Sequence, residues 1–152
     1  MFSKNERVLI CESELIEFYE AAVKAGENEI VGALVGMTTN GEYLVLSIFK
    51  YRGMSSPMRV TYKQLENAFL PAGLENLGTI HTHVGIGVFL SSVDLANLRG
   101  KRLNRIAIVM DPKNSDIRTY DKEGRLIELK VVDDNEIFSQ VEIKVFQKYG
   151  LP

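Results

Sequence analysis

The two histidines of the chain are separated by a single residue, in the order His81, Thr82, His83. Alternate residues of a strand point to the same face, so both imidazoles would project into one space. Ser91 and Asp94 follow with a spacing that puts both on one face of a helix, and a strand–loop–helix connection can return the start of that helix to the histidines. Two imidazoles and a carboxylate are ligands that zinc accepts. Three protein ligands leave a fourth tetrahedral position for water, as in catalytic zinc sites.

Each part of this pattern also has an ordinary structural explanation. A histidine on a strand is usually a packed or a surface residue, and Ser-x-x-Asp before an apolar stretch is more often a helix capping box than a catalytic motif. Ser91 can serve both purposes, because a residue that caps the helix can still face a metal. The closely spaced histidines together with the Ser-x-x-Asp pattern, rather than either alone, favour a metal site.

Two segments resemble a known family. HTHVGIGVFLSSVD (81–94) resembles the His-x-His-x(7)-Ser-x-x-Asp signature of the JAMM, or MPN-domain, metalloproteases. EIVGALVG (29–36) is similar to the Glu-x-x-Gly-x-Leu-x-Gly strand that carries the family's catalytic glutamate. The resemblance covers roughly residues 10–130, and the short single-domain format is similar to the prokaryotic members. Val84 replaces the proline that usually follows the second histidine; because that proline is not a ligand, the expected chemistry is unchanged.

The resemblance implies one Zn²⁺ per chain and a role for each of several residues. These are the zinc ligands His81, His83 and Asp94, the general base Glu29, and Ser91 beside the developing oxyanion. Glu27 stands two residues before Glu29 and would face the same side of an extended segment, so spacing alone does not separate the two glutamates. The register with the family's Gly-x-Leu-x-Gly pattern selects Glu29.

The pattern of apolar residues predicts an α/β (α+β) single domain in which a mixed β-sheet is flanked by helices. The resemblance implies the MPN/JAMM fold, a cytidine-deaminase-like architecture. The 152 residues, 45% of them hydrophobic, suit one domain over residues 1–152, with a core at about 10–132. Helices are expected at residues 14–25, 61–69, 91–100 and 136–149. Strands are expected at residues 30–36, 43–51, 77–83, 106–110, 116–120 and 126–132.

Local signals set several of these boundaries. Ser13 is a plausible N-cap of the first helix and Gly26 its end, and Asn40-Gly41 predicts a hairpin between the first two strands. One face of the last helix carries Phe138, Val141, Val145 and Tyr149. Packing of this face against the core is the ordinary interpretation, and a homodimer or partner surface is the alternative.

The composition bears on where the protein is located in the cell and on which classes of partner it binds. No apolar stretch approaches the roughly 20 residues of a membrane span, and the N-terminus lacks the form of a signal peptide, so we expect a cytoplasmic protein. The net charge of −2 gives no electrostatic reason to expect nucleic-acid binding. The lone Cys11 excludes an internal disulfide framework and a cysteine-rich zinc site.

The resemblance implies hydrolysis of an amide, characteristically the isopeptide bond between a lysine and the C-terminal tail of a ubiquitin-like or sulfur-carrier protein. The modifier or its conjugates are therefore the expected partner. Residues 52–60 and 84–90 are candidates for the rim of a groove that takes an extended tail, or else a solvated loop and a buried turn. Two alternatives remain open: a zinc hydrolase of a small amide or thio-modified carrier, and a non-catalytic MPN scaffold. A nucleobase deaminase would need a Cys-x-x-Cys pair and a helical zincin a His-Glu-x-x-His, and the chain has neither.

Overall fold

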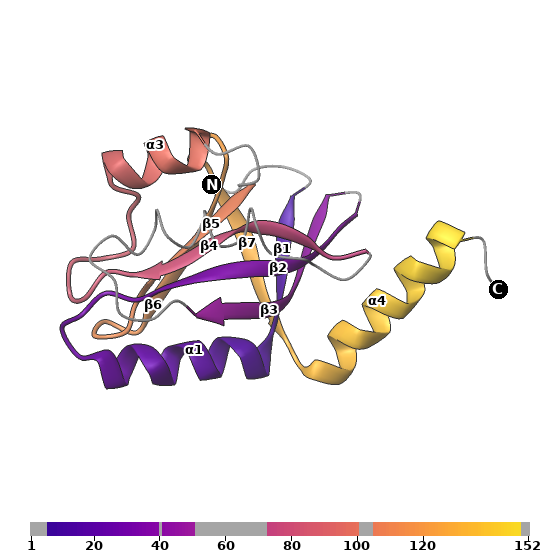
Figure 1. The fold of residues 1–152 in the computed structure, drawn as a ribbon, viewed down its shortest axis with the longest axis horizontal. Coiled ribbons are helices and arrows are strands. Elements are labelled where there is room, and N and C mark those ends of the chain that lie inside the picture. The colour runs from indigo at the N-terminus through magenta and orange to yellow at the C-terminus, as the bar shows by residue number, and fades with distance from the viewer. Residues whose placement is uncertain (1–5, 40, 51–72, 101–104, 150–152) are drawn as a thin grey trace.

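The computed structural model describes residues 6–39, 41–50, 73–100 and 105–149. Within these ranges the chain forms an α+β domain in which helices pack on a mixed sheet, which confirms the predicted fold class (Figure 1). The predicted helix at 61–69 and the predicted rim segment at 52–60 lie outside the described residues. The strands are β1 (Arg7–Cys11), β2 (Val31–Thr39), β3 (Glu42–Lys50), β4 (Glu75–Thr82), β5 (Ile106–Asp111), β6 (Asp116–Asp121) and β7 (Leu126–Val132). The helices are α1 (Glu12–Ala25), α3 (Ser92–Gly100) and α4 (Asp134–Tyr149).

The strands close into a barrel in the order β1-β3-β2-β4-β5-β6-β7, because β7 returns to pair with β1. β1 runs parallel to both β3 and β7, and β4 runs parallel to β5, whereas the other neighbours are antiparallel. β1 is not among the strands predicted from the sequence. Residues 8–11 are all buried, so the signal for this strand is a continuous apolar run directly before the first helix.

The core lies between the barrel strands and α1. In Figure 1, α1 runs along one side of the sheet and α3 lies across the other. Phe18 and Ala22, one turn apart on α1, are both buried, and Phe18 joins the main apolar cluster of the strands. Burying one such large apolar side chain contributes about 1.5–3 kcal/mol. Leu77 and Ile80 of β4 belong to the same cluster, so the strand that carries the histidines is held in the centre of the core.

Two glycines of the segment at 29–36 fix the position of β2. A Cβ at Gly32 would lie 2.7 Å from Ile48 Cγ2, and a Cβ at Gly36 would overlap the carbonyl oxygen of Leu44. Only glycine allows β2 and β3 to approach this closely. The register of β2 is therefore set by sterics, and with it the position of Glu29 just before the strand.

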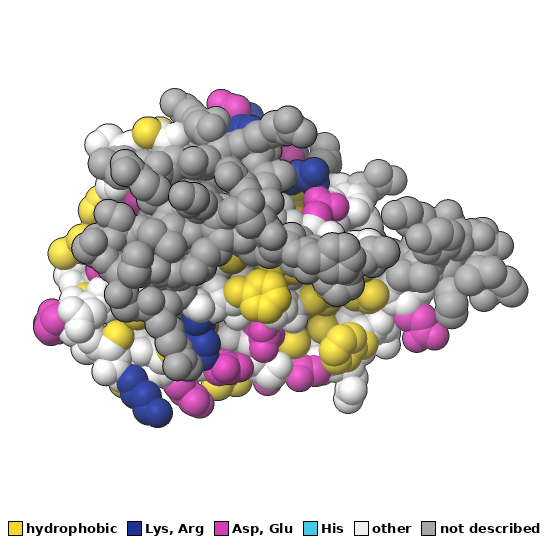
Figure 2. Space-filling model, viewed as in Figure 1, with side chains coloured by type: hydrophobic (Ala, Val, Ile, Leu, Met, Phe, Trp, Pro, Cys, Tyr) yellow, Lys and Arg dark blue, Asp and Glu magenta, His cyan; other side chains and the backbone are white. Residues whose placement is uncertain are grey.

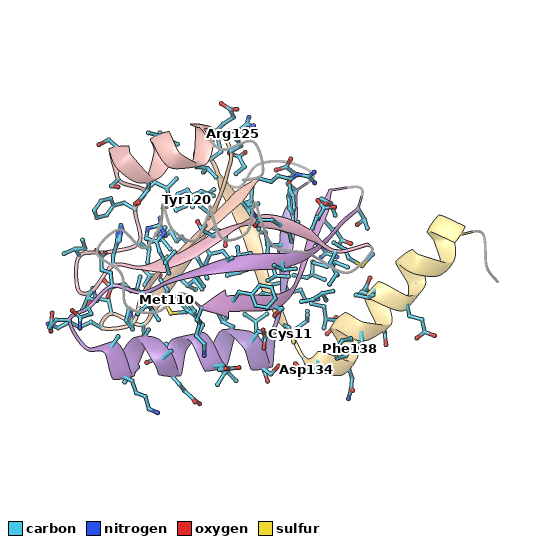
Figure 3. The ribbon with its side chains drawn as sticks, viewed as in Figure 1. Cys11, Met110, Tyr120, Arg125, Asp134 and Phe138 are labelled. Carbon is cyan, nitrogen blue, oxygen red and sulfur yellow. The ribbon has the colours of Figure 1, made fainter. Side chains whose placement is uncertain are left out.

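The signals for hairpin and helix end are confirmed, and the predicted N-cap is wrong. Gly41 between β2 and β3 has φ 76°, and Gly26 after α1 has φ 60°, a region that favours glycine. The N-cap of α1 is Cys11, whose side chain makes no capping hydrogen bond. The Ser13 N–H donates to Asp134 Oδ1 at 3.4 Å and the Cys11 thiol donates to the same oxygen at 2.9 Å. Figure 3 labels Cys11 and Asp134, where the starts of α1 and α4 meet. The Asp134 carboxylate, at the start of α4, thus accepts an N–H group of the first turn of α1, the capping role that we predicted for the Ser13 side chain.

The predicted packing face of the last helix is wrong at Phe138. Ile137 is 0% exposed and Val141 packs beside it against β1 and β3, whereas Phe138 is 61% exposed (Figure 3). The side chains of Val145 and Tyr149 lie outside the described residues. The start of α4 is tied to α1, which fixes the rotation of the helix and turns Ile137 inward. The rest of α4 extends away from the barrel (Figure 1).

On the face seen in Figure 2, acidic and basic side chains are interspersed with apolar ones. In the part of the chain that the structure describes, no helix is both long enough and apolar enough to cross a membrane. Among the described residues, large apolar side chains are exposed on α1, β3, β7 and α4, and on the loop at 84–90, which leads from β4 to α3.

Candidate metal centre

The candidate ligands come from the end of β4 and from the first turn of α3. The Thr82 N–H donates to the Ile30 carbonyl oxygen at 3.0 Å, and the Ile30 N–H donates to Thr82 Oγ1 at 2.9 Å. On the other side, the His83 N–H donates to the Met110 carbonyl oxygen at 2.9 Å. The backbone of this segment is therefore fixed from both sides. Alternation along the strand direction turns His81 and His83 to the same face.

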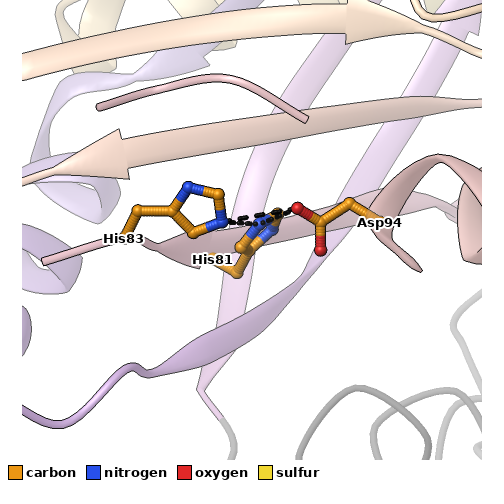
Figure 4. Close-up of side chains that lie close together, drawn as sticks. All are labelled: His81, His83 and Asp94. Carbon is orange, nitrogen blue, oxygen red and sulfur yellow. Dashed lines mark hydrogen bonds and ion pairs between the residues drawn. The ribbon is translucent and has the colours of Figure 1, made fainter. Parts of the chain in front are cut away.

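The three candidate ligand atoms form a nearly equilateral triangle (Figure 4). His81 Nε2 lies 3.2 Å from His83 Nε2 and 3.2 Å from Asp94 Oδ2, and His83 Nε2 lies 3.3 Å from the same oxygen. Zinc binds such atoms at about 2.0–2.1 Å, and two corners of a tetrahedron with bonds of that length are about 3.3–3.4 Å apart. The spacing of the three atoms is therefore consistent with a metal site of the zinc type, formed by three ligands among the described residues.

Asp94 owes its position to the N-terminal cap of α3. The Asp94 N–H donates to Ser91 Oγ at 3.0 Å, and the Ser91 N–H donates to Asp94 Oδ2 at 3.0 Å. The Leu95 N–H donates to the Ser91 carbonyl oxygen at 3.0 Å, at the start of the helix. Ser91 thus forms the reciprocal capping box, one of the two interpretations of its motif. The box also aims the Asp94 carboxylate at the histidines, so the two interpretations are compatible.

The electrostatics of Asp94 suit a metal ligand. Burial favours the neutral acid, but the hydrogen bond and charge of His81 and the hydrogen bonds from Ser91 outweigh it, so the pKa of Asp94 lies well below its usual value. The first turn of α3 also favours an anion, because the helix dipole is positive there. The carboxylate is therefore in the deprotonated form that binds a metal at neutral pH.

The loop after β4 orients the second histidine. His83 Nδ1 lies 3.2 Å from the carbonyl oxygen of Gly87. A carbonyl only accepts, so this contact places a proton on Nδ1, and in the neutral imidazole Nε2 is then the atom that can bind a metal. The Phe89 ring packs beside this imidazole, with ring centroids 5.0 Å apart. Among the described residues, the buried His81 Nδ1 has no hydrogen-bond partner.

The triangle opens onto a cleft of about 320 Å³. Every site residue predicted from the sequence lines this cleft, although the catalytic roles of Glu29 and Ser91 stay predictions. Ile86 and Phe89, which are 62% and 48% exposed, form an apolar part of its rim within the predicted segment 84–90. The lining residues are Glu29, Ile30, Val31, His81, Thr82, His83, Ile86, Phe89, Ser91 and Asp94.

The structure separates the two glutamates that spacing alone left equivalent. Val31 stands opposite His81 in the antiparallel β2–β4 pair, so continuing this register puts Glu29 opposite His83. Glu29 is exposed and lines the cleft, whereas Glu27 is exposed and does not line it.

Thr82 is a site residue that sequence reasoning missed. It is 0% exposed, and its hydroxyl accepts the N–H of Ile30 beside Glu29. The signal was its place between the histidines: alternation turns it away from the ligand face, toward β2. It therefore links the segment that carries the ligands to the segment that carries the glutamate.

Comparison with known proteins identifies relatives for most of the chain. Residues 12–122 match the family of prokaryotic homologs of the JAB domain. COP9 signalosome complex subunit 5 of Kluyveromyces lactis is 29% identical over 124 residues, which cover 72% of this chain and 32% of that protein. The same subunit of Eremothecium gossypii is 30% identical over 109 residues, covering 62% of this chain and 25% of that protein. The chain thus spans about a third or less of the length of these relatives.

Solved structures share the fold. A JAB1/MPN domain protein from Archaeoglobus fulgidus superposes with a TM-score of 0.59 at 23% identity, covering 81% of this chain and 97% of that one. A structure described as a JAMM metalloprotease-like zinc site in the proteasome and signalosome has a TM-score of 0.52 at 20% identity, covering 84% and 97%. A protein from Desulfitobacterium hafniense has a TM-score of 0.60 at 16% identity, covering 84% and 94%. The family match over residues 12–122, the shared fold and the candidate metal cluster together suggest a metallohydrolase.

Proposed function

Because the chain belongs to the family of prokaryotic JAB-domain homologues, we propose that it is a zinc-dependent metallo-isopeptidase. Its substrate in this proposal is the amide bond at the C-terminal tail of a ubiquitin-like or sulfur-carrier protein. The observation that carries the proposal is the ligand triangle, with sides of 3.2–3.3 Å, opening onto a cleft that Glu29 and Ser91 also line. A non-catalytic scaffold has no need of such a ligand set.

His81, His83 and Asp94 would hold the ion. Zinc in such a site lowers the pKa of water toward about 7 and polarises a carbonyl group. The residues of the chain keep the ligands in the form and orientation that binding requires. Asp94 stays ionised beside His81, and the Gly87 carbonyl keeps the proton of His83 on Nδ1.

Glu29 acts as the general base. Its carboxylate stands at the cleft opposite His83 in the continued β2–β4 register. From there it takes a proton from the attacking water and passes it to the leaving amine, which a lysine side chain supplies in an isopeptide bond. The bonds around Thr82 and Ile30 hold the adjoining backbone in place.

Ser91 stabilises the negative charge that develops on the carbonyl oxygen. Its Oγ accepts the Asp94 N–H, which leaves the hydroxyl proton available to donate into the cleft. A donor aimed at the developing charge typically contributes a factor of about 100–1,000 in rate. The capping role holds the hydroxyl in place before substrate arrives.

Two observations support the proposed class of substrate: the family match and the apolar rim of the cleft. Ile86 and Phe89 offer exposed apolar surface beside the candidate ligands, which suits an extended tail with apolar side chains. Each described strand already has a neighbour on either side in the closed sheet. We therefore propose that the tail lies along the loop at 84–90.

The test is cleavage of defined conjugates by the purified chain. A ubiquitin-like protein joined to a lysine, the same protein as a linear fusion, and a small amide made from its last residues are each incubated with the protein. We expect cleavage of the lysine-linked conjugate, its loss with a chelator, its recovery with added zinc, and no activity in His83→Ala. Cleavage of the small amide alone would move the function to small-molecule hydrolysis. Inactivity of the zinc-loaded protein on all three substrates would remove the proposed function.

A further inference from the structure

Asp111, at the end of β5, is a buried carboxylate that the proposed chemistry does not use. Its side chain is 0% exposed and accepts five hydrogen bonds, all from neutral N–H groups. Oδ1 accepts from the backbone N–H groups of Gly85, Lys113 and Asn114 at 2.9, 3.1 and 3.3 Å. Oδ2 accepts from the Gly87 N–H and from Asn114 Nδ2, both at 2.8 Å. Burial disfavours the charge, but these bonds outweigh it and lower the pKa of Asp111 to about 2.

Two of these donors belong to the loop that connects β4 to α3. Gly85 has φ 77° and Gly87 has φ 96°, conformations that are strained for other residues. These two residues lie in a loop, so their N–H groups are not part of the hydrogen-bond pattern of a helix or strand. The Asp111 carboxylate accepts both. The shape of the loop therefore depends on one carboxylate from a neighbouring strand.

The same loop residue touches a candidate ligand. Gly87 donates its N–H to Asp111 Oδ2 and accepts the Nδ1 proton of His83 on its carbonyl oxygen. Asp111 is thus connected to the imidazole through a single residue. Ile86, between the two glycines, lies on the apolar rim of the cleft, so the same anchor also sets the rim.

We propose that Asp111 is a positioning residue of the metal centre: by holding Gly85 and Gly87, it sets the carbonyl that orients His83 and the rim that receives the substrate. This inference rests on the proposed function for its metal. Residues that orient a metal-binding histidine typically contribute a factor of 10–100 in metal affinity. Asp111→Asn keeps the size of the side chain but turns one acceptor into a donor. At the Oδ2 position the new amide would face the donors of Gly87 and the Asn114 side chain, and at the Oδ1 position it would face three backbone N–H groups.

The first measurement is zinc affinity, by competition with a chelating dye. We expect Asp111→Asn to bind zinc about 10–100-fold more weakly than the wild type. Asp116→Asn is the matched control, because it makes the same charge change in the same β5–β6 hairpin. Asp116 is exposed, and its Oδ1 accepts the N–H of the next residue, Ile117. Its zinc affinity should equal that of the wild type.

The second measurement reports on His83 directly. Only two histidines occur in the chain, so long-range ¹⁵N–¹H spectra of the zinc-loaded protein contain two imidazole spin systems. The Nδ1 proton of His83 should exchange slowly with water in the wild type and in Asp116→Asn, and should exchange rapidly in Asp111→Asn. A role limited to fold stability would lower the unfolding temperature without moving this signal.

The outcomes separate the inference from the function. If the wild type binds no zinc, the proposed function is overturned. The inference can still be supported in that case, by loss of the protected His83 Nδ1 proton in zinc-free Asp111→Asn but not in the zinc-free wild type. A folded Asp111→Asn with wild-type zinc affinity and a protected His83 proton overturns the inference alone. Should Asp111→Asn fail to fold, Asn114→Ala removes one exposed donor to Oδ2. It should weaken zinc binding by a factor of up to about 10, and unchanged binding together with an unchanged His83 signal would count against the inference.

Discussion

Replacing Glu29 with glutamine tests the division of labour between the ligand triangle and the glutamate. The substitution keeps the size of the side chain and removes its ability to take a proton. Glu29 is exposed and stands outside β2, so the free energy of unfolding should change by less than about 0.5 kcal/mol. The ligands come from β4 and α3, so zinc content should be that of the wild type.

The expected loss is kinetic. A positioned general base contributes a factor of about 100–10,000 in rate, which is about 2.7–5.4 kcal/mol of barrier at 1.36 kcal/mol per tenfold change. Because Glu29 acts in the chemical step, the loss should appear in kcat with KM nearly unchanged. No stability effect of comparable size is available to explain such a loss.

The assay is steady-state cleavage of a lysine-linked conjugate by zinc-loaded Glu29→Gln. Glu27→Gln is the matched control: it makes the same change two residues away, at an exposed glutamate that does not line the cleft. It should retain full activity. Full activity in Glu29→Gln, or a comparable loss in Glu27→Gln, would refute the assignment of the base.

Three further predictions follow from the geometry. Ser91→Ala should lower kcat about 100–1,000-fold while zinc is retained, and should cost about 1 kcal/mol of stability because the Asp94 N–H loses its cap; an unchanged kcat would remove the oxyanion role. Ile86→Ser should raise KM for a conjugate and leave kcat unchanged, whereas Ile16→Ser, exposed on α1, should change neither; equal KM values in both variants would argue against the rim. The pKa of Asp111 is lowered from 3.8 to about 2 by hydrogen bonds to the native loop, so its contribution to stability is complete above pH 4 and is lost as the pH falls toward 2. Urea unfolding should show at most about 2 kcal/mol of this loss in the wild type and none of it in Asp111→Asn; the same acid dependence in both proteins would contradict the linkage.

The ligand cluster was predictable because the residues that determine its geometry lie close together in the sequence. Strand alternation brings His81 and His83 to one face, and the capping box requires the Asp94 side chain to turn back toward the start of α3. Only one loop separates these two elements, so few arrangements were open to them. The roles of Glu29 and Ser91 came from resemblance, and the structure brings both residues to the cleft without testing what they do.

The features that escaped prediction depend on contacts distant in the sequence. β1 is short, and its pairing with β3 and β7 is decided by the closure of the sheet. Ser13 has the right side chain for an N-cap, but Asp134, 121 residues away, accepts its N–H. A helical pattern could not distinguish Ile137 from Phe138 as the buried residue, because the attachment of α4 to α1 sets the rotation of the helix. Asp111 did not stand out in the sequence, where the predicted strand ends at residue 110, because its partners Gly85 and Gly87 become neighbours only through the parallel β4–β5 pair.

Metal content bears most directly on the central claim that His81, His83 and Asp94 share one ion. Elemental analysis of the purified wild type, after dialysis against zinc and then against zinc-free buffer, should give one zinc per chain. His83→Ala and Asp94→Ala, treated in the same way, should give almost none. A wild type without stoichiometric zinc, or folded variants that keep it, would contradict the claim.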